Sequence, residues 1–284
     1  MEMSSEKPKV SIIIPTYNSE GTLSECLKAV FNQSYPFYEV IIVDNFSNDG
    51  TVRIAEEFQV KILRQKCNPA LARNIGIVNS TGKYMLFLDS DQILSTLVIS
   101  ECIEKCESEG AGMARIPEIF TGKGFWSSCS AVWKNYYIDI EKLNTIVDDI
   151  TLGEPRFFLR EHVTRVGMLD ARLFWGEDYE LYTRLKKMNI RESSCKSKLY
   201  HYEPASVKDI IVKNLHYGKS VRAFLQKTRE LVFPLLFRNA LLTFMKVFRD
   251  FKKTPSIIVG CAILLCVKTC SMTMGLITGF LEIF

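Results

Sequence analysis

The chain has 284 residues, of which 47% are hydrophobic and 24% charged, a composition that excludes a disordered protein and suits one large domain or one domain with an appendage. Its net charge is only +4, but the last third is rich in lysine and arginine, which indicates an anionic partner there, either nucleic acid or a membrane surface. The nine cysteines include no Cys-x-x-Cys pair, so they predict reduced residues in a cytosolic compartment rather than a zinc site or disulfides. The polar segment Met1 to Lys9 predicts that no signal peptide is present.

Short β-rich runs alternate with amphipathic stretches between Val10 and Leu88. Strands are predicted at Val10 to Pro15, Val40 to Val43, Val60 to Leu63 and Tyr84 to Leu88. Helices are predicted around Leu23, Leu27 and Val30, at Thr51 to Phe58, and at Leu71 to Val78. Strands separated by helices predict βαβ units, and hence an α/β protein with a Rossmann-like, mainly parallel sheet flanked by helices.

Polar side chains follow the first two of these strands. Pro15 fixes a turn after the first strand, so Tyr17, Asn18 and Glu20 are expected at its carboxyl end, where open α/β sheets bind ligands. Asp44 ends the second strand and is expected to accept hydrogen bonds from a base or a ribose. Asp49 is better explained as a helix N-cap.

Two aspartates, Asp89 and Asp91, follow the apolar strand that ends at Leu88. Such a pair suits Mg²⁺ or Mn²⁺ carrying a diphosphate, because these cations take carboxylates together with phosphate oxygens and water. The alternative is a turn or an N-cap, in which Asp-x-Asp is also common.

After Asp91 the pattern loosens into loops and an aromatic-rich stretch from Phe125 to Tyr137. Segments in this position often form the pocket of a second substrate. Large aromatic residues are nevertheless buried more often than not, so we expect this stretch to belong to the core.

The end of the chain is both basic and apolar. Residues 206–253 predict basic amphipathic helices, and Ile257 to Leu281 is long enough to cross a bilayer. Lys268 falls near the centre of this apolar stretch, where it would cost roughly 2.5–3.5 kcal/mol unless it snorkels or pairs. Gly275 and Gly279 have the small-xxx-small spacing of packed membrane helices. The segment therefore spans a membrane or lies in its plane; the alternative is a helical hairpin buried against the rest of the chain.

Five segments, in this order and spacing, resemble the large inverting glycosyltransferase family 2, which has the GT-A fold. They are Val10 to Asn18, Val43 to Thr51, Ala72 to Gly76, Leu88 to Asp91, and Gly167 to Asp170 followed by Trp175 to Leu181. The similarity covers about Val10 to His201. The chain has Asn45 where the family often has an acidic residue, and it lacks the Gln-x-x-Arg-Trp signature of processive synthases, which indicates transfer of a single sugar.

The resemblance implies a role for individual residues. Pro15, Tyr17, Glu20 and Asp44 match residues that hold the nucleoside, Arg73 lies where a basic side chain orders the nucleotide pocket, Asp89 matches the carboxylate near ribose and metal, Asp91 matches the principal metal ligand, and Asp178 matches the catalytic base. His201 follows a predicted strand and is either a metal ligand or a structural residue. Arg115 either reaches a phosphate or forms a surface salt bridge.

These observations predict a Mg²⁺- or Mn²⁺-dependent inverting glycosyltransferase on the cytoplasmic face of the cell membrane. It would move one sugar from a UDP- or GDP-sugar to a polyprenyl phosphate or a lipid-linked glycan, and it would not bind nucleic acid. The predicted organisation is a polar segment at 1–9, a GT-A domain at 10–205, basic helices at 206–253 and an apolar helix at 254–284. The alternatives are a sugar-nucleotide pyrophosphorylase-like enzyme and a non-catalytic nucleotide-binding membrane protein; the first needs a glycine-rich phosphate loop, which Pro15 to Asn18 does not provide.

Overall fold

The computed structural model describes residues 7–143, 155–204, 206–228, 232–252 and 254–281. The chain divides into two compact units. Unit 1 comprises Met1–Glu118, Glu154–Ala171 and Glu177–Tyr200, and unit 2 comprises Ile119–Gly153, Arg172–Gly176 and His201–Phe284. Most of the predicted polar N-terminal segment, residues 1–6, lies outside the described residues, as do residues 205, 229–231, 253 and 282–284 of the predicted C-terminal segments.

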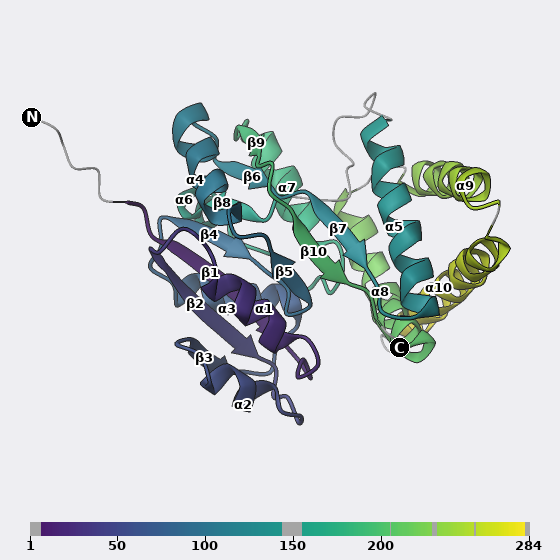
Figure 1. Cartoon of the computed structure of the whole chain (residues 1–284), viewed down its shortest axis with the longest axis horizontal. Helices are drawn as coiled ribbons and strands as arrows, with labels where there is room; N and C mark the ends of the chain where they lie inside the picture. Colours follow the sequence, from purple (N-terminus) through teal and green to yellow (C-terminus); the bar gives the residue numbers. More distant parts are fainter. Residues whose placement is uncertain (1–6, 144–154, 205, 229–231, 253, 282–284) are drawn as a thin grey trace, which may run out of the picture. The chain divides into compact units, whose positions relative to one another are not determined.

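The first half of unit 1 alternates strands and helices as predicted (Figure 1). Its elements are β1 (Val10–Thr16), α1 (Leu23–Phe31), β2 (Tyr38–Asp44), α2 (Thr51–Glu56), β3 (Lys61–Arg64), α3 (Pro69–Val78) and β4 (Tyr84–Phe87). These elements are followed by β5 (Gln92–Leu94), α4 (Val98–Glu109), β6 (Met113–Arg115), β7 (Glu118–Thr121), β8 (Phe157–Leu159), α6 (Arg160–Arg165), α7 (Glu177–Lys187), β9 (Glu192–Ser194) and β10 (Leu199–Tyr202). Every strand and helix predicted up to Leu88 is confirmed, with small shifts at the ends.

The main sheet has seven strands in the order β3-β2-β1-β4-β8-β6-β9. Strands β3, β2, β1 and β4 are parallel, whereas β8 runs antiparallel to both β4 and β6. In the register of β1 with β2, Thr16 is the partner of Asp44. The predicted mixed, mainly parallel sheet is therefore confirmed, and the carboxyl ends of β1, β2 and β4 meet at one edge.

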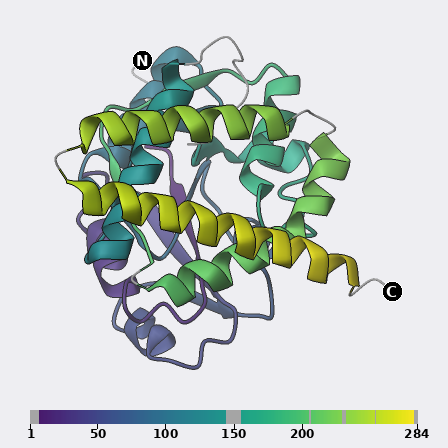
Figure 2. The same cartoon turned by 90° about the vertical axis from the view of Figure 1, so that its right-hand side faces the viewer.

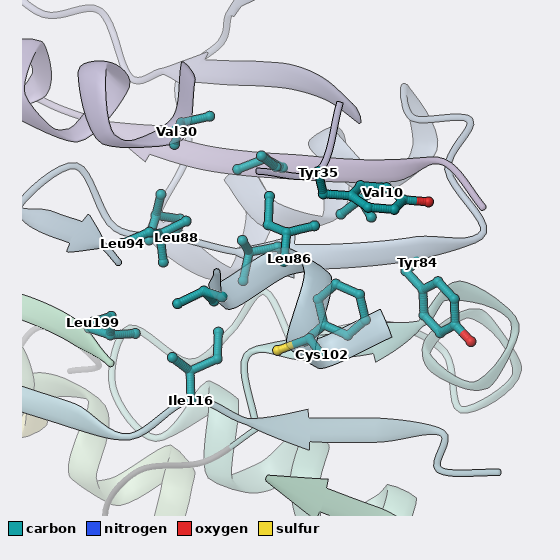
Figure 3. Close-up of a cluster of buried hydrophobic side chains, with 14 of the residues drawn as sticks. Val10, Val30, Tyr35, Tyr84, Leu86, Leu88, Leu94, Cys102, Ile116 and Leu199 are labelled. Atoms are coloured by element: carbon teal, nitrogen blue, oxygen red, sulfur yellow. The ribbon is translucent and has the colours of Figure 1, made fainter. Parts of the chain in front are cut away.

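The central strands β1, β2 and β4 are buried on both faces, to which their successive side chains alternately point. Ile12 and Ile14 of β1 pack in one cluster with apolar residues of α1 and α4, and part of this cluster is drawn in Figure 3. Ile13 packs in another cluster with residues of α3, α6 and α7. Gly76 lets α3 approach β1 closely, since a Cβ at this position would lie 2.3 Å from Cγ2 of Ile13.

Unit 2 contains four long helices: α5 (Phe125–Leu143), α8 (Val207–Thr228), α9 (Val232–Asp250) and α10 (Pro255–Leu281). Helix α10 packs on α8 and α5, and α9 packs on α5. Figure 2 shows α9 and α10 running alongside one another. Trp133 and Tyr137 are buried, which confirms that the aromatic-rich stretch belongs largely to a core.

One stretch of the described residues, Pro255–Thr278 of α10, is long and apolar enough to cross a membrane, and 22% of its most apolar part is buried. Its inner face packs within unit 2. A Cβ at Gly275 would lie 2.1 Å from the carbonyl oxygen of Leu215 on α8, and Lys268 Nζ donates a hydrogen bond of 2.8 Å to Ser130 Oγ on α5. Gly275 therefore serves helix packing inside the chain, and Lys268 is paired.

Candidate active site

Asp44 is fully buried at the end of β2, and its carboxylate organises the loop that follows. Its oxygens accept hydrogen bonds from Thr16 Oγ1 at 3.1 Å, from the Ser47 amide at 3.0 Å and from Ser47 Oγ at 2.5 Å. Arg64 Nε adds an ion pair at 3.2 Å. Burying a carboxylate is tolerated here because every partner is a donor. The structure thus shows Asp44 shaping the loop, and direct contact with a base or ribose stays a prediction.

The loops after β1 and β2 are joined by reciprocal hydrogen bonds. The Asn18 amide donates to Ser47 Oγ and the Asn48 amide donates to Asn18 Oδ1, each at 2.9 Å. Glu20 Oε2 accepts from the Gly50 amide at 2.6 Å. Asn18 and Glu20 therefore fix the shape of this edge, while Pro15 lies in β1 itself.

Two aromatic side chains project from these loops. Tyr17 is 58% exposed and Phe46 is 51% exposed, and Arg64 lies over the Phe46 ring at 5.4 Å from its centroid. Phe46 has a φ of +53°, a conformation that bulky residues rarely adopt, so the loop contacts hold it in place. The N-cap of α2 is Gly50, so the prediction that Asp49 occupies this position is wrong by one residue. Asp49 still accepts a hydrogen bond from the Thr51 amide at 3.0 Å, at the first residue of the helix. Phe46 was not singled out from the sequence, because nothing there shows that it is exposed.

Asp89 and Asp91 lie in a tight turn between β4 and β5. The Asp89 amide donates to Gln92 Oε1 at 2.9 Å, which closes the turn. Burial raises the pKa of the Cys26 thiol on α1, and the negative charges of Asp91 and Asp89 raise it further. The turn that the sequence left as an alternative is present, and it holds the two carboxylates at the strand end.

Arg73 on α3 connects the two carboxylate groups of the site. Its side chain is 3% exposed, and it forms ion pairs with Asp89 Oδ1 at 2.7 Å, Glu177 Oε1 at 2.8 Å and Asp178 Oδ1 at 3.4 Å. These negative charges outweigh the effect of burial and raise the pKa of Arg73. Its Nε is buried without a partner among the described residues. One guanidinium thus joins the end of β4 to the start of α7.

Glu177 and Asp178 open α7, where the helix dipole favours negative charge. Glu177 is buried, whereas the Asp178 side chain is 34% exposed and therefore accessible to a substrate. Burial raises the pKa of Glu177 to about 7, the neighbouring charge of Asp178 adds to this shift, and Arg73 opposes it. The buried member of the pair suits a positioning role and the accessible one suits proton transfer.

Arg156 and Glu118 complete the cluster, and neither was predicted from the sequence. Arg156, directly before β8, lies 3.3 Å from Asp89 Oδ2 and 3.8 Å from Glu118 Oε1. Gln92 Nε2 also donates to Glu118 Oε1, at 3.2 Å. The sequence does show a charged residue, Arg156, directly before the apolar run Phe157–Leu159. That Arg156 lies near Asp89 follows only from the pairing of β8 with β4, which the sequence does not show.

The two remaining candidates, Arg115 and His201, contact other residues. Arg115 forms an ion pair with Glu192 on β9 and lies over the Tyr182 ring, 5.0 Å from its centroid, so the salt bridge that the sequence left open is present. His201 belongs to unit 2, where it is buried with its ring 5.0 Å from that of Phe120. Phosphate binding by Arg115 and metal binding by His201 stay predictions.

The donor set fits a metal that keeps most of its bonds for substrate and water. Among the residues that the structure describes, no group of three or more His, Cys, Asp or Glu is arranged to hold a metal ion. Both oxygens of Asp89 face arginines, so its negative charge is already compensated by positive charge. A single carboxylate with phosphate oxygens and water is a usual environment for Mg²⁺.

Relatives with matching sequences include glycosyltransferases and a teichoic acid biosynthesis protein. The chain is 43% identical to glycosyltransferase AglE of Haloferax volcanii over 98 residues, 31% of this chain and 32% of that protein. It is 27% identical to the minor teichoic acid biosynthesis protein GgaA of Bacillus subtilis over 233 residues, 76% of this chain and 51% of the relative. The chain thus spans about a third to a half of these relatives.

Two solved structures share the fold. The mannosyltransferase PcManGT from Pyrobaculum calidifontis, in complex with GDP-Man and Mn²⁺, has a TM-score of 0.60 at 18% identity and covers 98% of this chain and 87% of its own. S. aureus TarS 1-349 in complex with UDP-GlcNAc has a TM-score of 0.56 at 19% identity, and the match covers 91% of this chain and 81% of the TarS chain. The model of the family Glycosyl transferase family 2 matches residues 11–166. The GT-A-like fold is confirmed, and the chain belongs to glycosyl transferase family 2.

Proposed function

We propose that the protein is a metal-dependent, inverting glycosyltransferase that moves a single sugar from a UDP- or GDP-sugar to a lipid-linked acceptor. One observation supports this most strongly: buried Arg73 pairs with both Asp89 and Asp178. A donor-side carboxylate and an accessible carboxylate at a helix N-terminus are thereby held at one site. An enzyme that brings a nucleotide sugar and an acceptor hydroxyl together needs such an arrangement.

Asp178 acts as the general base in this proposal. It removes the proton of the acceptor hydroxyl as that oxygen attacks the anomeric carbon, and the nucleoside diphosphate leaves from the opposite face. One such displacement inverts the anomeric configuration. Arg73 and Glu177 hold Asp178 in position from the buried side.

Mg²⁺ or Mn²⁺ would be held by Asp91, with Asp89 as a further candidate ligand. When bound, such a cation neutralises the negative charge that develops on the leaving diphosphate. The similar mannosyltransferase PcManGT, solved in complex with GDP-Man and Mn²⁺, supports this assignment.

The nucleoside would lie at the edge formed by the loops after β1 and β2. Exposed Tyr17 and Phe46 offer aromatic faces on which a base can stack, and the ordered hydrogen bonds of Asn18 and Glu20 keep these loops in shape. Pro15 and Asp44 position the loops from inside. Arg115 stays a candidate for phosphate binding.

We propose further that unit 2 attaches the enzyme to the cytoplasmic face of a membrane through α9 and α10 lying in the membrane plane. On α9 the exposed apolar residues are Leu241, Met245 and Phe248, and on α10 they are Val259, Ile263, Met274 and Ile277. The spacing places each set on one face of its helix. The opposite faces pack on α5 and α8, which favours the in-plane arrangement over a span. In this proposal residues 10–205 carry the transferase and residues 206–284 the membrane attachment.

Transfer assays with a panel of UDP- and GDP-sugars, and a polyprenyl phosphate or a membrane lipid extract as acceptor, test this function. We expect one donor to be used, with release of a nucleoside diphosphate, and a loss of about 100-fold or more when EDTA removes the metal. Formation of a nucleotide sugar from a sugar 1-phosphate and a nucleoside triphosphate would instead identify a pyrophosphorylase. Binding of nucleotides without any turnover would identify a non-catalytic protein.

A further inference from the structure

A second cluster of charged residues lies in unit 2, on residues that the proposed reaction does not use. Glu203, just after β10, accepts a hydrogen bond from Ser130 Oγ at 2.5 Å. It also forms an ion pair with Lys134 Nζ at 2.5 Å. Ser130 Oγ in turn accepts from Lys268 Nζ at 2.8 Å. The chain of contacts Lys134–Glu203–Ser130–Lys268 thus links α5, the end of β10 and the middle of α10.

Positive charge dominates this cluster. Glu203 lies within 2.5 Å of Lys134, whereas the ammonium of Lys268 donates to a neutral hydroxyl. Lys213 on α8 adds a third positive charge that acts on both Glu203 and Lys268. Although burial alone would raise it, the positive charges of Lys134 and Lys213 hold the pKa of Glu203 at about 2.

The surroundings of the cluster are apolar. Cys129 and Cys261, next to Ser130 and on α10 respectively, are buried in the helical core together with Leu264. Burial and the charge of Lys134 lower the pKa of Lys268 to about 8, while Glu203 opposes that shift. An ammonium in such a place destabilises the fold unless an anion compensates it.

A purely structural ion pair explains only part of this arrangement. Lys134 and Glu203 satisfy one another, and Ser130 completes the carboxylate's hydrogen bonds. Lys268 is not needed for that pair, and an apolar residue would pack better in a helix as apolar as α10. The side chain of Lys134 is 30% exposed, so solvent reaches the cluster there.

We propose that Lys134 and Lys268 of this cluster bind a phosphate group of a lipid-linked ligand. The two ammonium groups supply the donors that a phosphate requires, and lysine is a common phosphate ligand. The single proton of Ser130 Oγ is donated to Glu203, so Ser130 holds Lys268 in place and does not itself donate to the phosphate. The apolar helices around it favour a phosphate attached to an isoprenoid chain over free phosphate. This inference rests on the proposed function, because it assigns the phosphate of the lipid-linked acceptor to unit 2.

Binding measurements on the full chain in detergent test this inference without turnover. The probes are farnesyl phosphate, farnesol and inorganic phosphate, titrated by calorimetry. Farnesyl phosphate should bind at least about tenfold more tightly than either of the others. Lys268→Met should weaken its binding by about tenfold, Lys268→Arg should keep it within about threefold, and Lys208→Met, at an exposed lysine of α8, should leave it unchanged.

Equal affinity of the wild-type protein and Lys268→Met for farnesyl phosphate would overturn the proposed site. If inorganic phosphate bound as tightly as farnesyl phosphate, the lipid part of the inference would be wrong. The melting temperature of each variant shows whether it is folded, and Lys268→Met should keep that of the wild type, since an apolar residue fits this environment. Donor binding is measured separately with UDP- and GDP-sugars, so failure of the glycosyltransferase assignment is distinguishable from failure of this one.

Discussion

Arg73 shows how one residue can organise a site that is distant in sequence. Its two terminal nitrogens contact Asp89 and Glu177, which are separated from it by 16 and 104 residues. A planar guanidinium can serve two carboxylates in different directions, which a lysine ammonium does with less geometric control. The buried Arg73 therefore sets the distance between the donor side and the proposed base.

We expect Arg73→Lys to reduce sugar transfer by about 100-fold, because one ammonium cannot hold Asp89 and Asp178 in their present geometry. Steady-state kinetics with the donor found in the panel measure this loss. Arg53→Lys, at an exposed position of α2, is the matched control and should be neutral. A variant at position 73 with normal turnover would show that Arg73 has only a structural role.

Single residues were predicted unevenly from the sequence. Asp89, Asp91, Arg73 and Asp178 could be singled out as candidates because each lies in a short local motif. Arg156 and Glu118 were not, because their contacts depend on β8 pairing with β4, which is a non-local event. The hydrogen bonds that Asp44 accepts could not be predicted from the sequence either, because two of the donors, Thr16 and Arg64, lie on neighbouring strands.

At the scale of elements, α9 carries the surface that best supports the proposed membrane attachment. Leu241, Met245 and Phe248 are 52%, 59% and 57% exposed and lie on one face of the helix. Arg238, Arg249 and Lys252 are exposed on the same helix or just after it. Apolar side chains combined with cations are the composition of helices that lie on anionic lipid surfaces.

Replacing Leu241, Met245 and Phe248 with glutamine should weaken binding to vesicles containing anionic lipid by at least about tenfold, because their apolar surface no longer enters the bilayer. Sedimentation with vesicles of phosphatidylcholine, with and without phosphatidylglycerol, measures this. The control carries Val78→Gln and Met188→Gln, which are exposed apolar residues of unit 1. Unchanged sedimentation of the α9 variant would refute attachment through this helix.

Elements were predicted best where the pattern is local. The buried runs of β1, β2 and β4 and the amphipathic α1 follow from apolar periodicity alone. The antiparallel β8 between β4 and β6 did not, because three residues give too short a pattern and strand order depends on long-range pairing. For α10 the sequence predicted a long apolar helix. The close packing of Gly275 against α8 could be seen only in the folded structure.

At the scale of the whole molecule, both units take residues from several parts of the chain. Unit 1 includes Glu177–Tyr200 and unit 2 includes Ile119–Gly153, so removing the residues after 205 would delete only part of unit 2. Family membership is established by the match at residues 11–166, and the GT-A-like fold extends through most of the chain in the similar structures. The family and fold could therefore be predicted from the motifs, whereas the division into units could not.

The most direct test of the proposed mechanism separates proton transfer from donor binding. For Asp178→Asn, which keeps the size of the side chain but removes the base, sugar transfer and the affinity for the nucleotide sugar are measured on the same preparation. The predicted result is a loss of transfer of about 1000-fold or more with donor affinity within about threefold of the wild type. Transfer at the normal rate by this variant would contradict the assignment of Asp178 as the base and with it the proposed mechanism.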